Sequence, residues 1–145
     1  MTPRGNESDP VLLARLRAHA RHGESFALWV GDGWLGLVSA CHDAIEGEFP
    51  QYELLAVKHR FGELAFQSFP RPWRPTDSAW TLAESSRLDD LTDLYQQRSK
   101  ATCEWCGQEA KLRESPQYDT TLCDGCEQAK LQAPPAAWGQ LFRRP

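Results

Sequence analysis

The sequence predicts an α+β protein in which helices pack on a small antiparallel sheet, with a four-cysteine zinc ribbon at the C-terminal end. Three observations support this prediction. Apolar residues with helical spacing alternate along the chain with apolar runs of strand length. A hairpin pattern lies near the middle, and two Cys-x-x-Cys pairs, Cys103/Cys106 and Cys123/Cys126, follow near the end. The 145 residues are enough for one domain with a small module.

The composition is that of a soluble globular protein. Apolar residues are 41% and charged residues 25% of the chain, and the net charge is −4. An acidic balance argues against nucleic-acid binding driven by bulk charge, although local basic patches remain possible. No apolar run approaches the roughly 18 residues of a membrane span. The N-terminus is too polar for a signal peptide, so we expect a cytoplasmic protein without a membrane partner.

The first third of the chain predicts a helix and a strand, after a disordered tail at residues 1–8. Asp9 is a typical N-cap and Pro10 a typical first residue of a helix, which Gly23 is expected to end. Residues 26–30 follow as an apolar run of strand length. The apolar stripe of the helix is expected at Val11, Leu12, Leu16 and His19 or Ala20.

A second helix is expected after a glycine turn at residues 31–33, where Asp32 can cap it. Gly47 is expected to follow its end. Cys41 lies on its apolar face, and we interpret this lone thiol as a small buried hydrophobe. The apolar positions with helical spacing are Trp34, Leu37, Val38, Cys41 and Ile45.

Residues 52–69 predict a β-hairpin with its turn at residues 61–63 and the turn glycine at positive φ. The alternating positions are Leu55, Val57 and His59 on one strand and Leu64, Phe66 and Ser68 on the other. We expect Val57 and Phe66 to be buried against the helices. Residues 70–75, in which prolines alternate with arginine and tryptophan, predict a stiff loop.

A long helix is predicted from Thr76 or Asp77 to about Lys100, and it runs directly into the first cysteine pair. A short helix is expected to follow Cys126 and to end near Leu131. The apolar stripe of the long helix is expected at Trp80, Ala83, Leu88, Leu91, Leu94 and Tyr95. The predicted organisation is a disordered tail (1–8), an α+β core domain (9–100), a zinc ribbon docked on the core (101–131) and a proline-rich tail (132–145).

The two cysteine pairs predict the zinc site. They are separated by sixteen residues, a spacing typical of four-cysteine zinc ribbons. A two-residue gap lets both sulfurs of one turn reach the same ion, and the intervening loop lets the second turn complete a tetrahedron. Disulfides are the alternative, and an intracellular chain disfavours them. The expected zinc ligands are Cys103, Cys106, Cys123 and Cys126.

Three segments resemble a group of small uncharacterised bacterial proteins. They are Gly33-Trp34-Leu35-Gly36-Leu37, Val57-Lys58-His59-Arg60-Phe61-Gly62-Glu63-Leu64-Ala65-Phe66, and Ser99 running into Cys103-Glu104-Trp105-Cys106-Gly107. In that group the second segment reads Val-Lys-x-Lys-Phe-Gly-x-Leu-x-Phe, so Arg60 departs from the usual lysine. Many members also end in Cys-x-x-His where this chain has a full Cys-x-x-Cys. The resemblance spans residues 33–127 and implies the architecture and the zinc site, but no activity.

No motif predicts catalysis or a small-molecule substrate. A zinc ion held by four cysteines has no open position for water or substrate. The Walker and dinucleotide glycine patterns are absent. None of the four histidines lies within the cysteine module. His42 or His59 could meet a carboxylate in space, but we interpret both as surface histidines. We therefore predict that the protein is not an enzyme.

Two binding hypotheses remain. The first is a protein-binding module, and within that class an inhibitor or immunity-type protein that covers a partner's active surface, because exposed tryptophan and arginine are enriched at protein–protein hot spots. The second is a nucleic-acid-binding accessory or regulatory zinc ribbon, because basic and aromatic residues interleave. The two hypotheses differ on whether the basic clusters merge on one face. The candidate partner-binding residues are Lys58, Arg60, Arg71, Trp73, Arg74 and Trp105, with Trp138 in the tail as a further unexplained tryptophan.

Overall fold

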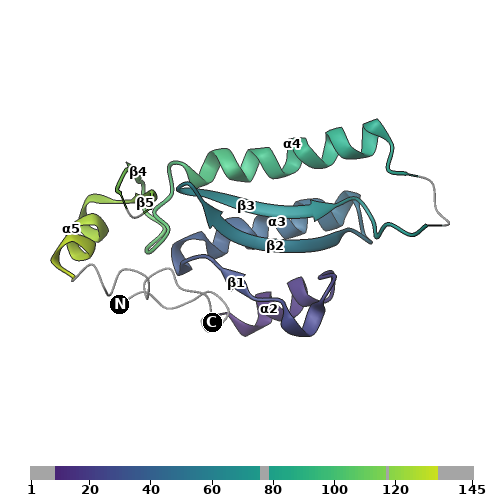
Figure 1. The fold of residues 1–145 in the computed structure, drawn as a ribbon, viewed down its shortest axis with the longest axis horizontal. Coiled ribbons are helices and arrows are strands. Elements are labelled where there is room, and N and C mark those ends of the chain that lie inside the picture. Colours follow the sequence, from purple (N-terminus) through teal and green to yellow (C-terminus); the bar gives the residue numbers. More distant parts are fainter. Residues whose placement is uncertain (1–8, 76–78, 117, 134–145) are drawn as a thin grey trace.

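The computed structural model describes residues 9–75, 79–116 and 118–133. A three-stranded sheet with strand order β1-β2-β3 has helices on one side, and a two-stranded sheet, β4-β5, joins α5 in a separate C-terminal module (Figure 1). In chain order the elements are α2 (Pro10–Arg17), the 3₁₀ turn η1 (Gly23–Ser25), β1 (Leu28–Trp29), the 3₁₀ turn η2 (Asp32–Trp34), α3 (Leu35–Glu48), β2 (Glu53–Arg60), β3 (Glu63–Phe69), α4 (Leu82–Ser99), β4 (Lys111–Arg113), β5 (Thr120–Leu122) and α5 (Asp124–Gln132). The predicted α+β fold class is confirmed, and β1 adds one parallel pairing to the antiparallel hairpin.

Helix α2 begins as predicted and ends earlier. The Asp9 side chain accepts a hydrogen bond from the Leu12 backbone N–H at 3.0 Å, and Leu12, Leu13 and Leu16 are buried. Placing Val11 on the apolar stripe is wrong, because its side chain is 70% exposed. At 100° per residue, Val11 lies about 150° from the centre of the buried stripe.

The start of the second helix differs from the prediction. Residues Asp32–Trp34 form a 3₁₀ turn and α3 begins at Leu35, without a side-chain cap from Asp32. The turn instead meets the C-terminal module, because the Gly33 N–H donates to the Glu104 carbonyl. The helix also continues through Gly47 to Glu48. Its buried side chains are Val38, Cys41, His42 and Ile45.

The hairpin has the predicted turn. Phe61 and Gly62 have φ values of 53° and 78°, which is the two-residue type I′ pattern. Val57 and Phe66 face each other across β2 and β3 and are buried, as predicted. The placement of Leu55 is wrong, because the register shifts between residues 54 and 56 and leaves Leu55 43% exposed.

Helix α4 starts five residues later than predicted. Thr81 accepts a hydrogen bond from the Glu84 N–H, and the Glu84 carboxylate accepts one from the Thr81 N–H. This reciprocal capping box fixes the helix start after Thr81. Leu88, Leu91 and Tyr95 are buried as expected. Placing Ala83 and Leu94 on the buried stripe of this helix is wrong, because both are exposed.

Several expectations concern residues outside the described ranges. The predicted tail at residues 1–8 and residues 134–145 of the tail predicted at 132–145, including Trp138, belong to this group, as do Thr76 and Asp77. Gln132 is instead the last residue of α5. Within the ranges that are described, no helix is both long and apolar enough to cross a membrane.

Candidate metal centre

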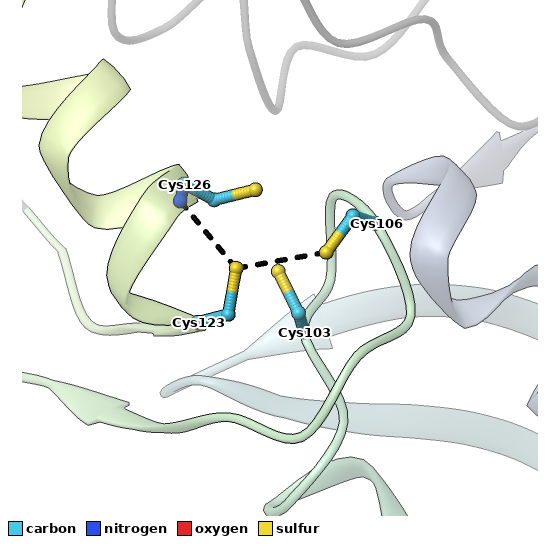
Figure 2. A group of neighbouring side chains, drawn as sticks. All are labelled: Cys103, Cys106, Cys123 and Cys126. Carbon is cyan, nitrogen blue, oxygen red and sulfur yellow. Dashed lines mark hydrogen bonds between the residues drawn. The ribbon is translucent and has the colours of Figure 1, made fainter.

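The four predicted cysteine ligands converge between the end of α4 and the start of α5 (Figure 2). Their sulfur atoms all lie within 4.8 Å of one another, and the Cys106 and Cys123 sulfurs are 3.6 Å apart. Metal–sulfur bonds of about 2.3 Å in a tetrahedron would place the sulfurs about 3.8 Å apart. The thiols therefore fit a single tetrahedral metal ion, and the predicted cluster is confirmed.

The first cysteine pair lies on a tight turn after α4. The Cys103 N–H donates to the Gln108 carbonyl at 2.7 Å, and the Gly107 N–H donates to the Cys103 carbonyl at 2.9 Å. Gly107 has a φ of 84°, a conformation that favours glycine. This local geometry turns Cys103 and Cys106 towards the same point (Figure 2).

The second pair lies at the N-terminus of α5, which starts at Asp124 instead of after Cys126. The Cys123 sulfur accepts a hydrogen bond from the Cys126 backbone N–H at 3.4 Å. This N–H lowers the pKa of the Cys123 thiol to about 7, which favours the thiolate that binds metals. The short strands β4 and β5 pair in register and bring this helix start back to the first turn.

The metal-binding turn is packed against the glycine turn that precedes α3. The Gly33 N–H donates to the Glu104 carbonyl at 2.7 Å, and the Gly31 N–H donates to the Glu104 carboxylate at 3.0 Å. A Cβ added at Gly33 would lie 2.1 Å from the Cys103 carbonyl oxygen. Glu104 is fully buried, and burial raises its pKa to about 8. The glycine turn was predicted from the sequence, but its contacts with Glu104 were not.

Two further contacts join the module to the core. The buried Trp34 donates from its indole Nε1 to the Thr102 carbonyl at 2.7 Å. The Thr121 hydroxyl of β5 donates to the Gly62 carbonyl in the hairpin turn at 2.6 Å. The module is therefore anchored both beside α3 and at the tip of the hairpin.

The residues predicted to bind a partner do not form one patch. In the strand register, Arg60 is opposite Glu63 at the turn end of the hairpin, and Glu53 is opposite Phe69 at its other end. The loop with Arg71, Trp73 and Arg74 follows that other end. Lys58 lies on β2, between the two ends. At about 3.3 Å per residue, the length of β2 separates the two ends by roughly 23 Å.

Two of the predicted residues have contacts within the fold. The Arg71 guanidinium lies 3.3 Å from the Glu84 carboxylate and braces the loop against α4. Trp105 was expected to face outward at the tip of the metal turn, but it is half-buried and packs against the Cys103 and Leu122 cluster. Trp73 is 54% exposed and Arg74 is exposed.

Comparisons with protein-family models, with curated proteins and with solved structures found no match. The functional argument therefore depends on the residues of this chain. Phe61, which was predicted only as a turn residue, lies in the hairpin turn beside the metal module and is 73% exposed. The sequence held one signal for this exposed side chain: Phe61 occupies a position where a type I′ turn prefers asparagine.

Proposed function

We propose that this protein is a non-catalytic binding protein whose C-terminal module is stabilised by structural zinc and which acts through protein–protein contact. Four thiolates in a tetrahedron suit zinc. A four-cysteine set fills the coordination sphere, so no position is left for a water or a substrate. This closed ligand set supports a structural role for the metal.

The observation that carries the binding proposal is Phe61. It has a φ of 53° and its side chain is 73% exposed. A left-handed conformation costs a residue with a Cβ roughly 1–2 kcal/mol, and an exposed phenylalanine gains nothing from burial. Phe61 therefore has both an unfavourable backbone conformation and an unfavourably exposed ring, and local strain of this kind is found at functional sites. A partner that buries the ring would offset both costs.

The surroundings of Phe61 define the partner's chemistry. The Arg60 guanidinium lies 5.5 Å from the centre of the Phe61 ring, and it makes no ion pair with the part of the chain that the structure describes. Leu112, 49% exposed, approaches the same turn from β4. An aromatic anchor beside an arginine and a leucine suits an apolar pocket rimmed by carboxylates. An inhibitor or immunity-type role, in which this surface covers a partner's active surface, is one form of the proposal.

The alternative is a nucleic-acid-binding zinc ribbon. Arg60 and the Arg71–Arg74 loop lie at opposite ends of the hairpin, which disfavours one continuous phosphate-binding face. Four thiolates around zinc also add local negative charge. The salt response separates the two functions, because phosphate contacts weaken log-linearly with salt and an aromatic-centred protein interface is much less sensitive.

The test places a photo-crosslinking phenylalanine analogue at position 61 and identifies the crosslinked molecule in the native host. That molecule is then purified and titrated with the wild type, Phe61→Asn and Trp73→Ala. Asparagine suits the left-handed turn position, so Phe61→Asn should raise the stability while binding weakens by at least about tenfold, or 1.4 kcal/mol. Trp73→Ala is the control, an exposed aromatic at the other end of the hairpin.

Two outcomes would contradict the proposal. One is equal binding by Phe61→Asn and the wild type. The other is capture of a nucleic acid whose binding falls steeply with salt, which would favour the alternative. Loss of binding in Trp73→Ala alone would move the interface to the proline-rich loop.

A further inference from the structure

A second cluster of metal-ligand side chains lies apart from the four cysteines. It consists of His19, which follows α2, and of His42 and Glu46, one turn apart on α3; their ligand atoms lie within 4.8 Å of one another. The expectation that His42 is a surface histidine is wrong, because its side chain is 1% exposed. Helix α3 starts next to the cysteine module, and eleven residues at 1.5 Å each place Glu46 about 16 Å along it.

The hydrogen bonds of His19 fix the position of its proton. The Nδ1 atom lies 2.8 Å from the Tyr52 carbonyl oxygen, which can only accept, so Nδ1 carries a hydrogen and donates. In the neutral ring Nε2 therefore has a lone pair. This atom lies 2.7 Å from the Glu46 carboxylate oxygen Oε2. Two electron-rich atoms at this distance require a cation, which is either a second proton on His19 or a metal ion.

His42 presents its Nε2 atom to the same carboxylate. Its Nδ1 atom lies 2.7 Å from the Tyr52 hydroxyl, and Nε2 lies 3.6 Å from Oε2 of Glu46. The neutral imidazole is the form that binds metals. Metal-binding histidines almost always hydrogen-bond through their other ring nitrogen. Tyr52 provides this support to both rings, through its carbonyl and its hydroxyl.

We propose that His19, His42 and Glu46 bind a divalent first-row transition-metal ion through the two Nε2 atoms and Oε2. Two imidazoles and a carboxylate suit zinc and its neighbours in that row. Metal–ligand bonds of about 2.0–2.1 Å in a tetrahedron place the ligand atoms about 3.3 Å apart. Oε2 of Glu46 would therefore move about 0.6 Å away from Nε2 of His19 and about 0.3 Å towards Nε2 of His42, which now lie 2.7 and 3.6 Å from it. The Glu46 side chain is 47% exposed and has room for this movement.

The open side of the cluster decides what kind of site this is. Three protein ligands leave at least one position for water, and the exposed side of Glu46 connects that position to solvent. The neighbouring charges permit a cation, because Arg15 is paired with Asp43 on the same helix. Unlike the four-cysteine site, this one is exchangeable, and its proposal does not depend on the function proposed above.

The test uses the full-length protein with one zinc ion already bound by the cysteines. Zn²⁺ is titrated into the wild type, Glu46→Gln and Glu48→Gln at neutral pH, and bound metal is measured by equilibrium dialysis at each concentration of free Zn²⁺. The wild type should take up a second equivalent, and Glu46→Gln should bind it at least about tenfold more weakly. Glu48→Gln is the matched control, because Glu48 is exposed on the same helix and pairs with Arg87.

Nitrogen-15 NMR of the histidine rings provides the site-specific readout. The Nε2 resonances of His19 and His42 should shift with the second equivalent, while those of His22 and His59 should not. The first equivalent should be retained in Glu46→Gln, which shows that the variant is folded. The proposal is overturned if the wild type binds only one equivalent, which would make the second cation a proton, or if Glu46→Gln binds the second as tightly as the wild type.

Discussion

Replacing Gly33 by alanine should separate the metal module from the core. The added Cβ would lie 2.1 Å from the Cys103 carbonyl oxygen, 2.5 Å from the Gly107 nitrogen and 2.7 Å from the Cys106 nitrogen. All three are backbone atoms of the metal-binding turn, so a side-chain movement cannot relieve the contact. The turn must retreat by about 1 Å to restore a normal van der Waals distance.

The magnitude follows from the hydrogen bonds that this retreat breaks. They join Gly33 and Gly31 to Glu104 and Trp34 to Thr102, at 2.7, 3.0 and 2.7 Å. Each has a net contribution of about 1 kcal/mol. Alanine also lowers the conformational entropy of the unfolded chain, and this raises the free energy of unfolding by about 0.4–1 kcal/mol. We expect the free energy of unfolding to fall by about 2 kcal/mol.

Urea unfolding of the zinc-loaded protein measures this change, and competition with a chelator measures zinc release, which should become faster. Gly36→Ala is the matched control, because it lies in α3 and a Cβ there would meet nothing within 4 Å. Alanine is the better helix former by roughly 0.8–1 kcal/mol, so this control should be slightly stabilised. A Gly33→Ala protein within about 0.5 kcal/mol of the wild type would refute the packing described at Gly33.

Four further predictions concern the metal, the core, the helix cap and the loop. Purified protein should contain about one cysteine-bound zinc per chain, and a strong chelator should remove hydrogen-exchange protection from residues 101–131 while sparing β2 and β3; no zinc, or zinc retained after replacement of all four cysteines, would contradict this. Phe66→Ala should lower the free energy of unfolding by roughly 3–5 kcal/mol, because the ring is 7% exposed; a loss below about 1 kcal/mol would show that this face is misplaced. Thr81→Ala should cost about 1 kcal/mol and increase exchange in the first turn of α4. The Thr81 N–H lowers the pKa of Glu84 below its ordinary 4.5, so the stability difference between the wild type and Glu84→Gln should be present above about pH 4.5 and shrink as the pH falls through the lowered pKa. Trp73→Ala should leave the melting temperature nearly unchanged, because this side chain is 54% exposed; a large drop would make Trp73 a core residue.

Local sequence signals predicted the parts of the fold that local chemistry determines. The Asp9 cap, the Gly62 turn and the spacing of the four cysteines each need only neighbouring residues, and the structure has all three. The start of α4 was also readable, since Thr81 and Glu84 have the spacing of a capping box. Thr76 and Asp77 have Ala79 and Trp80 three residues later, whereas Thr81 has Glu84, so only Thr81 can form a capping box.

The contacts that the sequence did not reveal are between distant residues. Gly33 meets the backbone of Cys103, seventy residues later, and a glycine gives no sign of what approaches it. Leu54 is buried and Leu55 is exposed, the reverse of what the alternating pattern predicts, because the strand register shifts between residues 54 and 56. The cluster of His19, His42 and Glu46 joins two helices around Tyr52. The sequence alone indicates that only His42 and Glu46 are neighbours, because they lie four residues apart on one helix.

The metal module and the proposed binding surface are coupled through the hairpin turn. The Thr121 hydroxyl holds the Gly62 carbonyl at 2.6 Å, and a Cβ on Gly62 would lie 2.7 Å from the Leu112 side chain. These contacts brace the turn that carries Phe61, and they come from residues of β4 and β5. Zinc would therefore act on binding without touching the partner: its loss frees the module, the turn relaxes, and the aromatic anchor is no longer pre-organised.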